Sequence, residues 1–238
     1  MGNHLGAVAG VLVAISAIGS SANSATIALS SATATYTQPG GWYPSTMIDG
    51  IFSGTNGWAI NEADTNTSHS QTALFVLATP LPATPQNLTF TIYQNFGASH
   101  LIGDFILAYT TDAIPTLGGD QTPFTLTGAS SLDSGTTFTT LGTGHLLTGG
   151  DIPDTDTYTI TTSVDAPITG IYLDAINDPE NGLPFGGPGH QPTDGNFVIS
   201  EFTVTTPPVP EPATWAMMIV GIGFAGASLR RRAASVHA

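Results

Sequence analysis

The sequence predicts an all-β fold, a β-sandwich or jelly roll built from many short strands. Two observations support this prediction. Several segments alternate apolar and polar residues with a period of two and are rich in threonine, valine, isoleucine and aromatic residues, whereas residues 26–208 show no helical period. Turn-forming pairs separate these segments, namely Asp49-Gly50, Asn56-Gly57, Asn181-Gly182 and Asp194-Gly195.

The clearest strand is predicted over residues 87–96, where Leu88, Phe90 and Ile92 alternate with threonines. Further β-rich segments follow in chain order at residues 105–110, 158–164, 168–175 and 197–205. No internal repeat or domain boundary interrupts them, so we expect a single sandwich over residues 26–206.

The charge of this sandwich is entirely acidic. All 17 acidic residues except Glu211 lie within residues 26–208, and that segment has no lysine or arginine. The resulting negative field disfavours nucleic acids and anionic membrane surfaces as partners and favours divalent cations. The chain also has no cysteine, so a structural metal would be a natural substitute for disulfides in an exported domain.

The N-terminus is typical of a signal peptide. Residues 5–18 are apolar and are followed by small residues up to Ala22, where cleavage would leave Ser20 at the −3 position. The segment before the apolar run has only His4 and the α-amine as positive groups, which departs from the usual pattern. We assign residues 1–25 to the signal peptide, with a retained anchor as the alternative.

The C-terminus is typical of a membrane-spanning segment. Residues 213–229 are uncharged, and about 17 residues of helix span roughly 26 Å, close to the thickness of a bilayer core. All basic residues of the chain follow directly as Arg230, Arg231 and Arg232, which keeps this end cytoplasmic. We therefore expect a transmembrane helix over residues 213–232, preceded by a stiff proline-rich linker at 207–212.

The same tail resembles a PEP-CTERM sorting signal. Its elements occur in the family's order, as Pro210-Glu211-Pro212, Trp215, Ala-Met-Met at 216–218, Gly-x-Gly-Phe at 221–224 and Arg230–Arg232. The resemblance implies that an exosortase recognises the Pro-Glu-Pro and cuts near it. It also implies delivery of the protein from the inner membrane to the periplasm, surface or exterior of a Gram-negative cell that makes exopolysaccharide. A plain C-terminal anchor is the alternative.

The body contains a series of short motifs in a characteristic order, at 47–50 (MIDG), 57–60 (GWAI), 72–75 (TALF), 168–173 (ITGIYL), 186–189 (GGPG) and 194–202 (DGNFVISEF). With these motifs it resembles the discoidin or coagulation-factor-type galactose-binding fold, including a bacterial variant attached to cytochrome-like proteins of planctomycetes. The resemblance implies a jelly-roll domain. It places Trp58 in the core, because this tryptophan lies in a motif that normally packs the sandwich.

The resemblance also implies a structural calcium ion between an early Asp-Gly loop and a glutamate of the last strand. The matching residues are Asp49 and Glu201, with Thr55 or Asn56 as further oxygen donors. Alternatively, Asp49 only caps a turn and Glu201 faces solvent. A second acidic loop, with Asp151, Asp154 and Asp156, is either another cation site or a hydrated turn.

Carbohydrate binding in this fold uses loop aromatics that stack on sugars and polar groups that recognise hydroxyls. Candidates in loop-like sequence are Trp42, Tyr43 and Phe185, with His190 and Asn181 as polar partners. The alternative for Trp42 is a partly buried aromatic at a strand edge.

Catalytic motifs are missing from the sequence. It has no His-Glu-x-x-His, no Gly-x-Ser-x-Gly and no phosphate-binding glycine loop, and its six histidines are scattered. We therefore expect a non-catalytic surface or matrix protein that associates with a glycan such as exopolysaccharide. The alternatives are a purely structural surface or biofilm protein, and a polysaccharide hydrolase with paired carboxylates.

Overall fold

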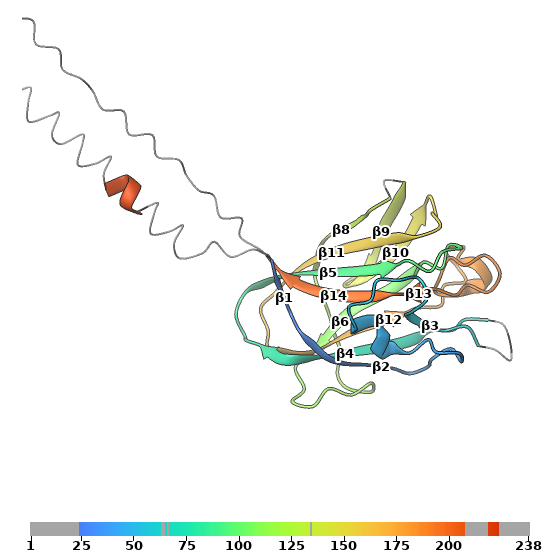
Figure 1. Ribbon diagram of the computed structural model, residues 1–238, viewed down its shortest axis with the longest axis horizontal. Coiled ribbons are helices and arrows are strands. Elements are labelled where there is room, and N and C mark those ends of the chain that lie inside the picture. The colour runs from blue at the N-terminus through green and yellow to red at the C-terminus, as the bar shows by residue number, and fades with distance from the viewer. Residues whose placement is uncertain (1–23, 63–64, 66, 134, 208–218, 224–238) are drawn as a thin grey trace, which may run out of the picture. The chain divides into compact units, whose positions relative to one another are not determined.

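Two antiparallel sheets pack face to face in this computed structural model, which describes residues 24–62, 65, 67–133, 135–207 and 219–223 (Figure 1). Among these residues, the five-stranded sheet has the order β1 (Ala25–Thr26), β14 (Glu201–Thr206), β5 (Gln86–Gln94), β11 (Asp156–Val164) and β8 (Leu126–Ser131). The seven-stranded sheet has the order β2 (Leu29–Ala34), β4 (Gln71–Leu81), β12 (Ile168–Ala175), β6 (Asp104–Thr110), β10 (His145–Gly150) and β9 (Thr136–Gly142), with β7 (Thr122–Pro123) paired to β6.

The chain follows a jelly-roll path through these sheets. From β4 to β14 it passes repeatedly from one sheet to the other, interrupted by the short β7, the β9–β10 hairpin and the short β13. A separate small ladder joins β3 (Trp58–Ala59) to β13 (Val198–Ile199). The predicted all-β jelly-roll sandwich is therefore confirmed.

The predicted strands correspond to β5, β6, β11 and β12, whereas the predicted strand at 197–205 is divided at Ser200. The hydroxyl of Ser200 accepts a hydrogen bond from the backbone N–H of Asn95 (3.1 Å), and its own N–H donates to the Tyr93 carbonyl (2.7 Å). These bonds separate β13 from β14 and tie the start of β14 to the end of β5.

Aromatic side chains from both sheets fill the core. Phe202 stacks on Phe75 from the opposite sheet with ring centroids 4.1 Å apart, and on Phe90 at 6.1 Å. Trp58 is completely buried against Phe197 at 5.2 Å, so its predicted place in the core is confirmed. With no lysine or arginine between residues 24 and 207, stability depends on this apolar burial and on hydrogen bonding.

The chain enters and leaves the sandwich at the same end, because Ala25 in β1 pairs with Thr206 in β14. The long connections 35–70, 95–103, 151–155 and 176–200 gather at the other end (Figure 1). We call this the loop end. It is where the candidate residues of the site are found.

Residues 219–223 are helical and belong to a unit separate from Ser24–Pro207. The rest of the predicted transmembrane helix lies outside the described residues, as do residues 1–23 of the predicted signal peptide and the sorting residues Pro210, Glu211, Pro212, Trp215 and Arg230–Arg232. Within the described part of the chain, no helix combines the length and apolarity needed to cross a bilayer.

Candidate functional site

Three aromatic side chains form a cluster at the loop end. Trp42 contacts Phe96 edge-on with ring centroids 5.1 Å apart, and Phe96 contacts His100 edge-on at 4.7 Å. Trp42 and His100 are half-buried, whereas Phe96 is exposed. We refer to Trp42, Phe96 and His100 as the aromatic cluster. Tyr43, the next residue after Trp42, is 58% exposed.

Local backbone preferences fix the Trp42 side of the cluster. Gly40 and Gly41 have φ values of +103° and +104°, which side chains other than glycine rarely adopt. The 3₁₀ helix η1 (Pro44–Ile48) then begins with a proline, whose fixed φ suits a helix start. The Tyr43 carbonyl accepts hydrogen bonds from the N–H and the hydroxyl of Thr46 (3.1 and 2.7 Å).

The other side of the cluster contains a strained turn. Gly97, Ala98 and Ser99 all have positive φ values, of 98°, 51° and 57°, and a non-glycine residue in this region costs of order 1 kcal/mol. Asp154 holds the turn, because its carboxylate accepts from the Ala98 N–H (2.5 Å) and its carbonyl accepts from the Ser99 N–H (3.2 Å). The turn places the rings of Phe96 and His100 side by side.

A second aromatic pair joins the adjoining loop to β5. Phe52 is 45% exposed and meets Tyr93 edge-on at 4.7 Å. The Asn95 side-chain amide donates to the Phe52 carbonyl (2.9 Å), which fixes the loop against the end of β5. Aromatic surface therefore extends along both sides of the β5 terminus.

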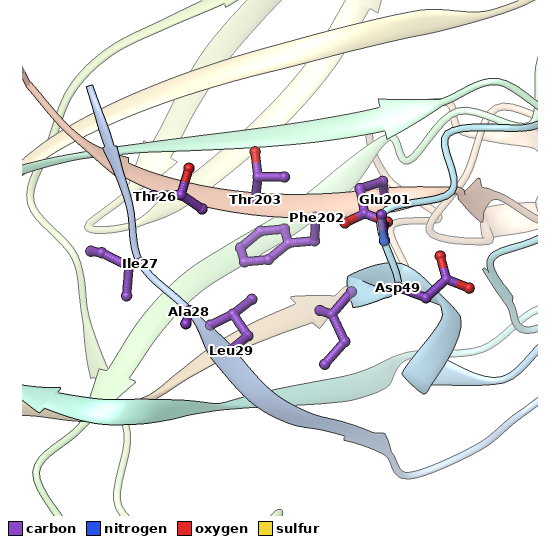
Figure 2. Close-up of a pocket in the computed structure, with 10 residues that line it drawn as sticks. Thr26, Ile27, Ala28, Leu29, Asp49, Glu201, Phe202 and Thr203 are labelled. Carbon is purple, nitrogen blue, oxygen red and sulfur yellow. Dashed lines mark hydrogen bonds between the residues drawn. The ribbon is translucent and has the colours of Figure 1, made fainter. Parts of the chain in front are cut away.

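The predicted calcium ligands Asp49 and Glu201 lie together at one end of a cavity of about 360 Å³ (Figure 2). The Gly50 N–H donates to the Glu201 carboxylate (3.2 Å), and the Asn56 amide donates to the Asp49 carboxylate (2.9 Å). Burial, reinforced by the charge of Asp49, raises the pKa of Glu201 to about 7 despite the Gly50 hydrogen bond.

The residues around this carboxylate pair fit a hard cation. The side-chain carbonyl of Asn56 is buried and has no hydrogen-bond partner, which leaves an oxygen donor on a side chain that contacts the Asp49 carboxylate. Thr55 is exposed, with its hydroxyl 3.4 Å from that of Ser53. No group of three His, Cys, Asp or Glu side chains converges among the described residues, so an ion here would need carbonyl oxygens as well as carboxylates.

Two observations bear on the alternatives for this pair. Asp49 does cap a turn, because its second carboxylate oxygen accepts from the Ile51 N–H (2.8 Å). Glu201 does not face solvent, since it is only 4% exposed.

The structure does not bring the remaining predicted residues to the aromatic cluster. His190 is buried against Thr148 (2.7 Å between the ring nitrogen and the hydroxyl), and burial lowers its pKa to about 4. Phe185 is 67% exposed and belongs to the separate turn η2 (Pro184–Gly186). The Asn181 backbone N–H donates to the Asp178 carboxylate (2.9 Å).

Asn181 instead lines a second cavity, of about 360 Å³, whose polar wall was not predicted from the sequence. Asp104, at the start of β6, is fully buried and contacts the carboxylate of Asp178 and the imidazole of His145. Burial and the Asp178 carboxylate raise the pKa of Asp104 to about 6, although His145 opposes the shift. These residues come from three distant segments, so no local sequence signal identifies them.

The three carboxylates of the second acidic loop have separate partners. Asp154 binds the strained turn, Asp156 accepts from the hydroxyls of Ser131 and Thr136 (2.5 and 3.0 Å), and Asp151 lies against Gly135. The acidic loop at 151–156 thus stabilises its neighbours at this end of the sandwich through three different contacts.

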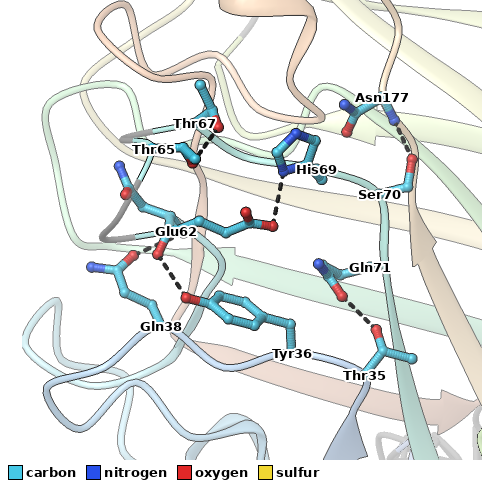
Figure 3. Close-up of polar contacts among 11 residues, drawn as sticks. Thr35, Tyr36, Gln38, Glu62, Thr65, Thr67, His69, Ser70, Gln71 and Asn177 are labelled. Carbon is cyan, nitrogen blue, oxygen red and sulfur yellow. Dashed lines mark hydrogen bonds and ion pairs between the residues drawn. The ribbon is translucent and has the colours of Figure 1, made fainter.

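A polar network covers the start of β4 (Figure 3). Glu62 contacts the His69 ring (2.8 Å), the Thr35 hydroxyl donates to Gln71 (2.6 Å), and the Asn177 N–H donates to the Ser70 hydroxyl (2.8 Å). These contacts join loop residues to one another and to β4, which indicates a role in fixing the loops.

Comparison with known protein families confirms the predicted sorting motif. A family model described as the PEP-CTERM protein-sorting motif matches residues 208–232. The chain therefore has the C-terminal signal of secreted proteins that a membrane segment holds until an exosortase processes them. No curated protein has a significantly similar sequence.

Solved structures similar to this chain include family 32 carbohydrate-binding modules. CpGH89CBM32-5 from Clostridium perfringens, in complex with GalNAc-beta-1,3-galactose, is 15% identical with a TM-score of 0.44, over 76% of this chain and 99% of that one. The module of C. perfringens NanJ, in complex with galactose, is 15% identical with a TM-score of 0.45, over 77% and 99%. The module of AlyQ, in complex with 4,5-unsaturated mannuronic acid, is 12% identical with a TM-score of 0.43, over 76% and 97%.

Proposed function

We propose that the sandwich is a non-catalytic module that binds a glycan at the loop end, on a protein that its sorting motif delivers to the cell surface or matrix. The aromatic cluster is the observation on which this proposal rests. Trp42, Phe96 and His100 are held in contact at the surface, and exposed aromatic patches rimmed by polar groups mark binding sites. Exopolysaccharide made by the same cell is the natural ligand for a protein sorted in this way.

The chemistry of the cluster suits a sugar. Aromatic rings pack against the apolar C–H faces of a pyranose, and polar groups beside them recognise its hydroxyls. One His100 ring nitrogen contacts the Gly97 carbonyl (2.8 Å), which orients the ring. Strain maintained at Ala98 and Ser99 supports a functional role for this turn, because strained backbone is concentrated at binding sites.

Calcium is the cofactor that we propose for the neighbouring carboxylate pair. Asp49, Glu201 and the unpartnered carbonyl of Asn56 would hold it, and its charge would offset the repulsion between the two carboxylates. Its role would be to brace the loop at 49–56, which places Phe52 against Tyr93.

Substitution of Trp42 by alanine tests the proposal. Because one stacked ring contributes a large part of the apolar contact, Trp42→Ala should weaken binding to the host exopolysaccharide about tenfold or more, with little change in Tm. Leu132→Ala is the matched control, since Leu132 is 83% exposed and belongs to the connection between β8 and β9. Equal affinity of the two variants would remove the cluster as the site, and turnover of the polysaccharide would establish a hydrolase instead.

A further inference from the structure

We infer that the glycan bound at the aromatic cluster has no negative charge, so that neutral or amine-bearing polysaccharides bind and uronate polymers are rejected. This inference rests on the proposed function and adds the ligand class to it. It depends on the charges that surround the cluster rather than on the rings themselves.

Carboxylates lie on both sides of the cluster. Asp154 binds the turn between Phe96 and His100 and is itself exposed. On the adjoining loop, Asp49 is exposed and follows η1, whereas its neighbour Glu201, the first residue of β14, is buried. A ligand seated on the rings therefore faces exposed carboxylates from two loops, Asp154 and Asp49.

No lysine or arginine balances these acids. Lysine and arginine are absent from residues 24–207, so the sandwich has no ammonium or guanidinium group to receive a uronate carboxylate. The side-chain donors of the cluster are the His100 imidazole and the Trp42 indole, which suit hydroxyl oxygens. A ligand amine, in contrast, would be attracted by the neighbouring carboxylates.

The size of the discrimination follows from the number of charges. Two like charges about 10 Å apart in water change affinity by roughly twofold at low salt. A uronate polymer places a charge on every sugar, so the exposed carboxylates of Asp154 and Asp49, acting on successive sugars, should weaken its binding by about tenfold when no calcium is bound. Salt should reduce this difference, because screening acts over about 10 Å or less at physiological ionic strength.

The inference is tested by measuring the affinity of the full-length protein, in the presence of EDTA, for three probes. These are a neutral polysaccharide, a polymer of glucosamine and a polymer of uronic acid. We expect the neutral and amine polymers to bind and the uronate polymer to bind at least tenfold more weakly at low salt, with a smaller gap at high salt. EDTA prevents calcium from bridging two carboxylates. Trp42→Ala, measured in parallel, identifies the part of the binding that belongs to the cluster.

Asp154→Asn provides the matched charge variant, because an asparagine oxygen can still accept from the Ala98 N–H. The ratio of uronate affinity to neutral-glycan affinity should rise about twofold at low salt and remain unchanged at high salt. Uronate binding that depends on Trp42 and equals neutral binding at low salt would overturn this inference but leave the proposed function in place. Absence of Trp42-dependent binding to every probe would overturn both.

Discussion

Individual carboxylates at the loop end stabilise the loops mainly by accepting hydrogen bonds from backbone N–H and hydroxyl groups. Asp154 stabilises two residues in an unfavourable backbone conformation, and Asp156 accepts hydrogen bonds from two hydroxyls. Asp104 is the extreme case, since it is buried beside a second carboxylate. With no arginine or lysine in the sandwich, the charged form of Asp104 has only hydrogen bonds and the His145 imidazole to offset its desolvation.

Asp104→Asn should therefore stabilise the protein at neutral pH. The pKa of Asp104 is raised from 3.8 to about 6, so the folded state binds the extra proton and stability falls as the pH rises through this window. An asparagine amide can donate to Asp178 and accept from His145 without ionising. The stability of the variant relative to the native protein should rise by about 1–3 kcal/mol between pH 4 and pH 7.

Urea unfolding at a series of pH values measures this difference. Asp165→Asn is the control, because Asp165 is exposed in the turn between β11 and β12 and should show no such trend. A difference for Asp104→Asn that stays constant with pH would contradict the assignment of a buried, protonated carboxyl.

At the scale of elements, strands with strict alternation were predictable from the sequence. Residues 168–175 are β12 itself, and β5 differs from its prediction mainly at the C-terminal end. The β9–β10 hairpin was not predicted, since residues 136–150 consist largely of threonine, glycine and leucine without a clear period. Its pairing depends on partners in β6 that are distant in the sequence.

The candidate site was predictable only in part, because its residues also come together from segments that are distant in the sequence. Trp42 and Tyr43 were recognisable as loop aromatics, but Phe96 was read as the end of a strand, because the left-handed turn that follows it has no glycine beyond Gly97. The contact of Phe96 with Trp42 joins two loops that only the folded sandwich brings together. His190 was chosen from a loop-like segment, yet the fold buries it.

Calcium should stabilise the contact between the loop at 49–56 and the start of β14. At a free concentration about one hundred times Kd, binding contributes about 2.7 kcal/mol, which corresponds to roughly 5–10 °C in Tm for a domain of this size. Glu201→Gln should abolish most of this rise, because glutamine can still accept from Gly50 but lacks the charge.

Differential scanning calorimetry with calcium and with EDTA measures the effect, and Asp165→Asn again serves as the control. A Tm that does not respond to calcium in the unaltered protein would exclude the metal site. The aromatic cluster could then still bind glycan, since its rings do not contact the proposed ligands directly.

For the whole molecule, the path of the chain separates the residue where the sandwich leads into the sorting motif from the proposed glycan site. Pro207 follows β14 at the end of the sandwich where β1 also pairs, and the sorting motif begins with the next residue. Within the sandwich, the aromatic cluster lies at the end opposite Pro207. Removal of the tail would also remove the three arginines, leaving a sandwich without any strongly basic side chain.

Mass spectrometry of the protein recovered from its host tests the processing step. Recognition of Pro-Glu-Pro by an exosortase predicts a new C-terminus near Pro210–Pro212, and the predicted signal peptide gives an N-terminus near residue 23. A product that still ends at Ala238 would reduce the motif to simple membrane anchoring.

The indole resonances of the protein provide the most direct test of the loop-end site. Trp42 belongs to the cluster, whereas the Trp58 indole is buried and donates to the Tyr36 carbonyl (2.9 Å). In ¹H–¹⁵N spectra assigned with Trp42→Phe, titration with a neutral glycan should shift the Trp42 indole signal and leave the Trp58 signal in place. A Trp42 signal that stays unchanged at glycan concentrations that saturate binding would contradict a glycan site at this end of the sandwich.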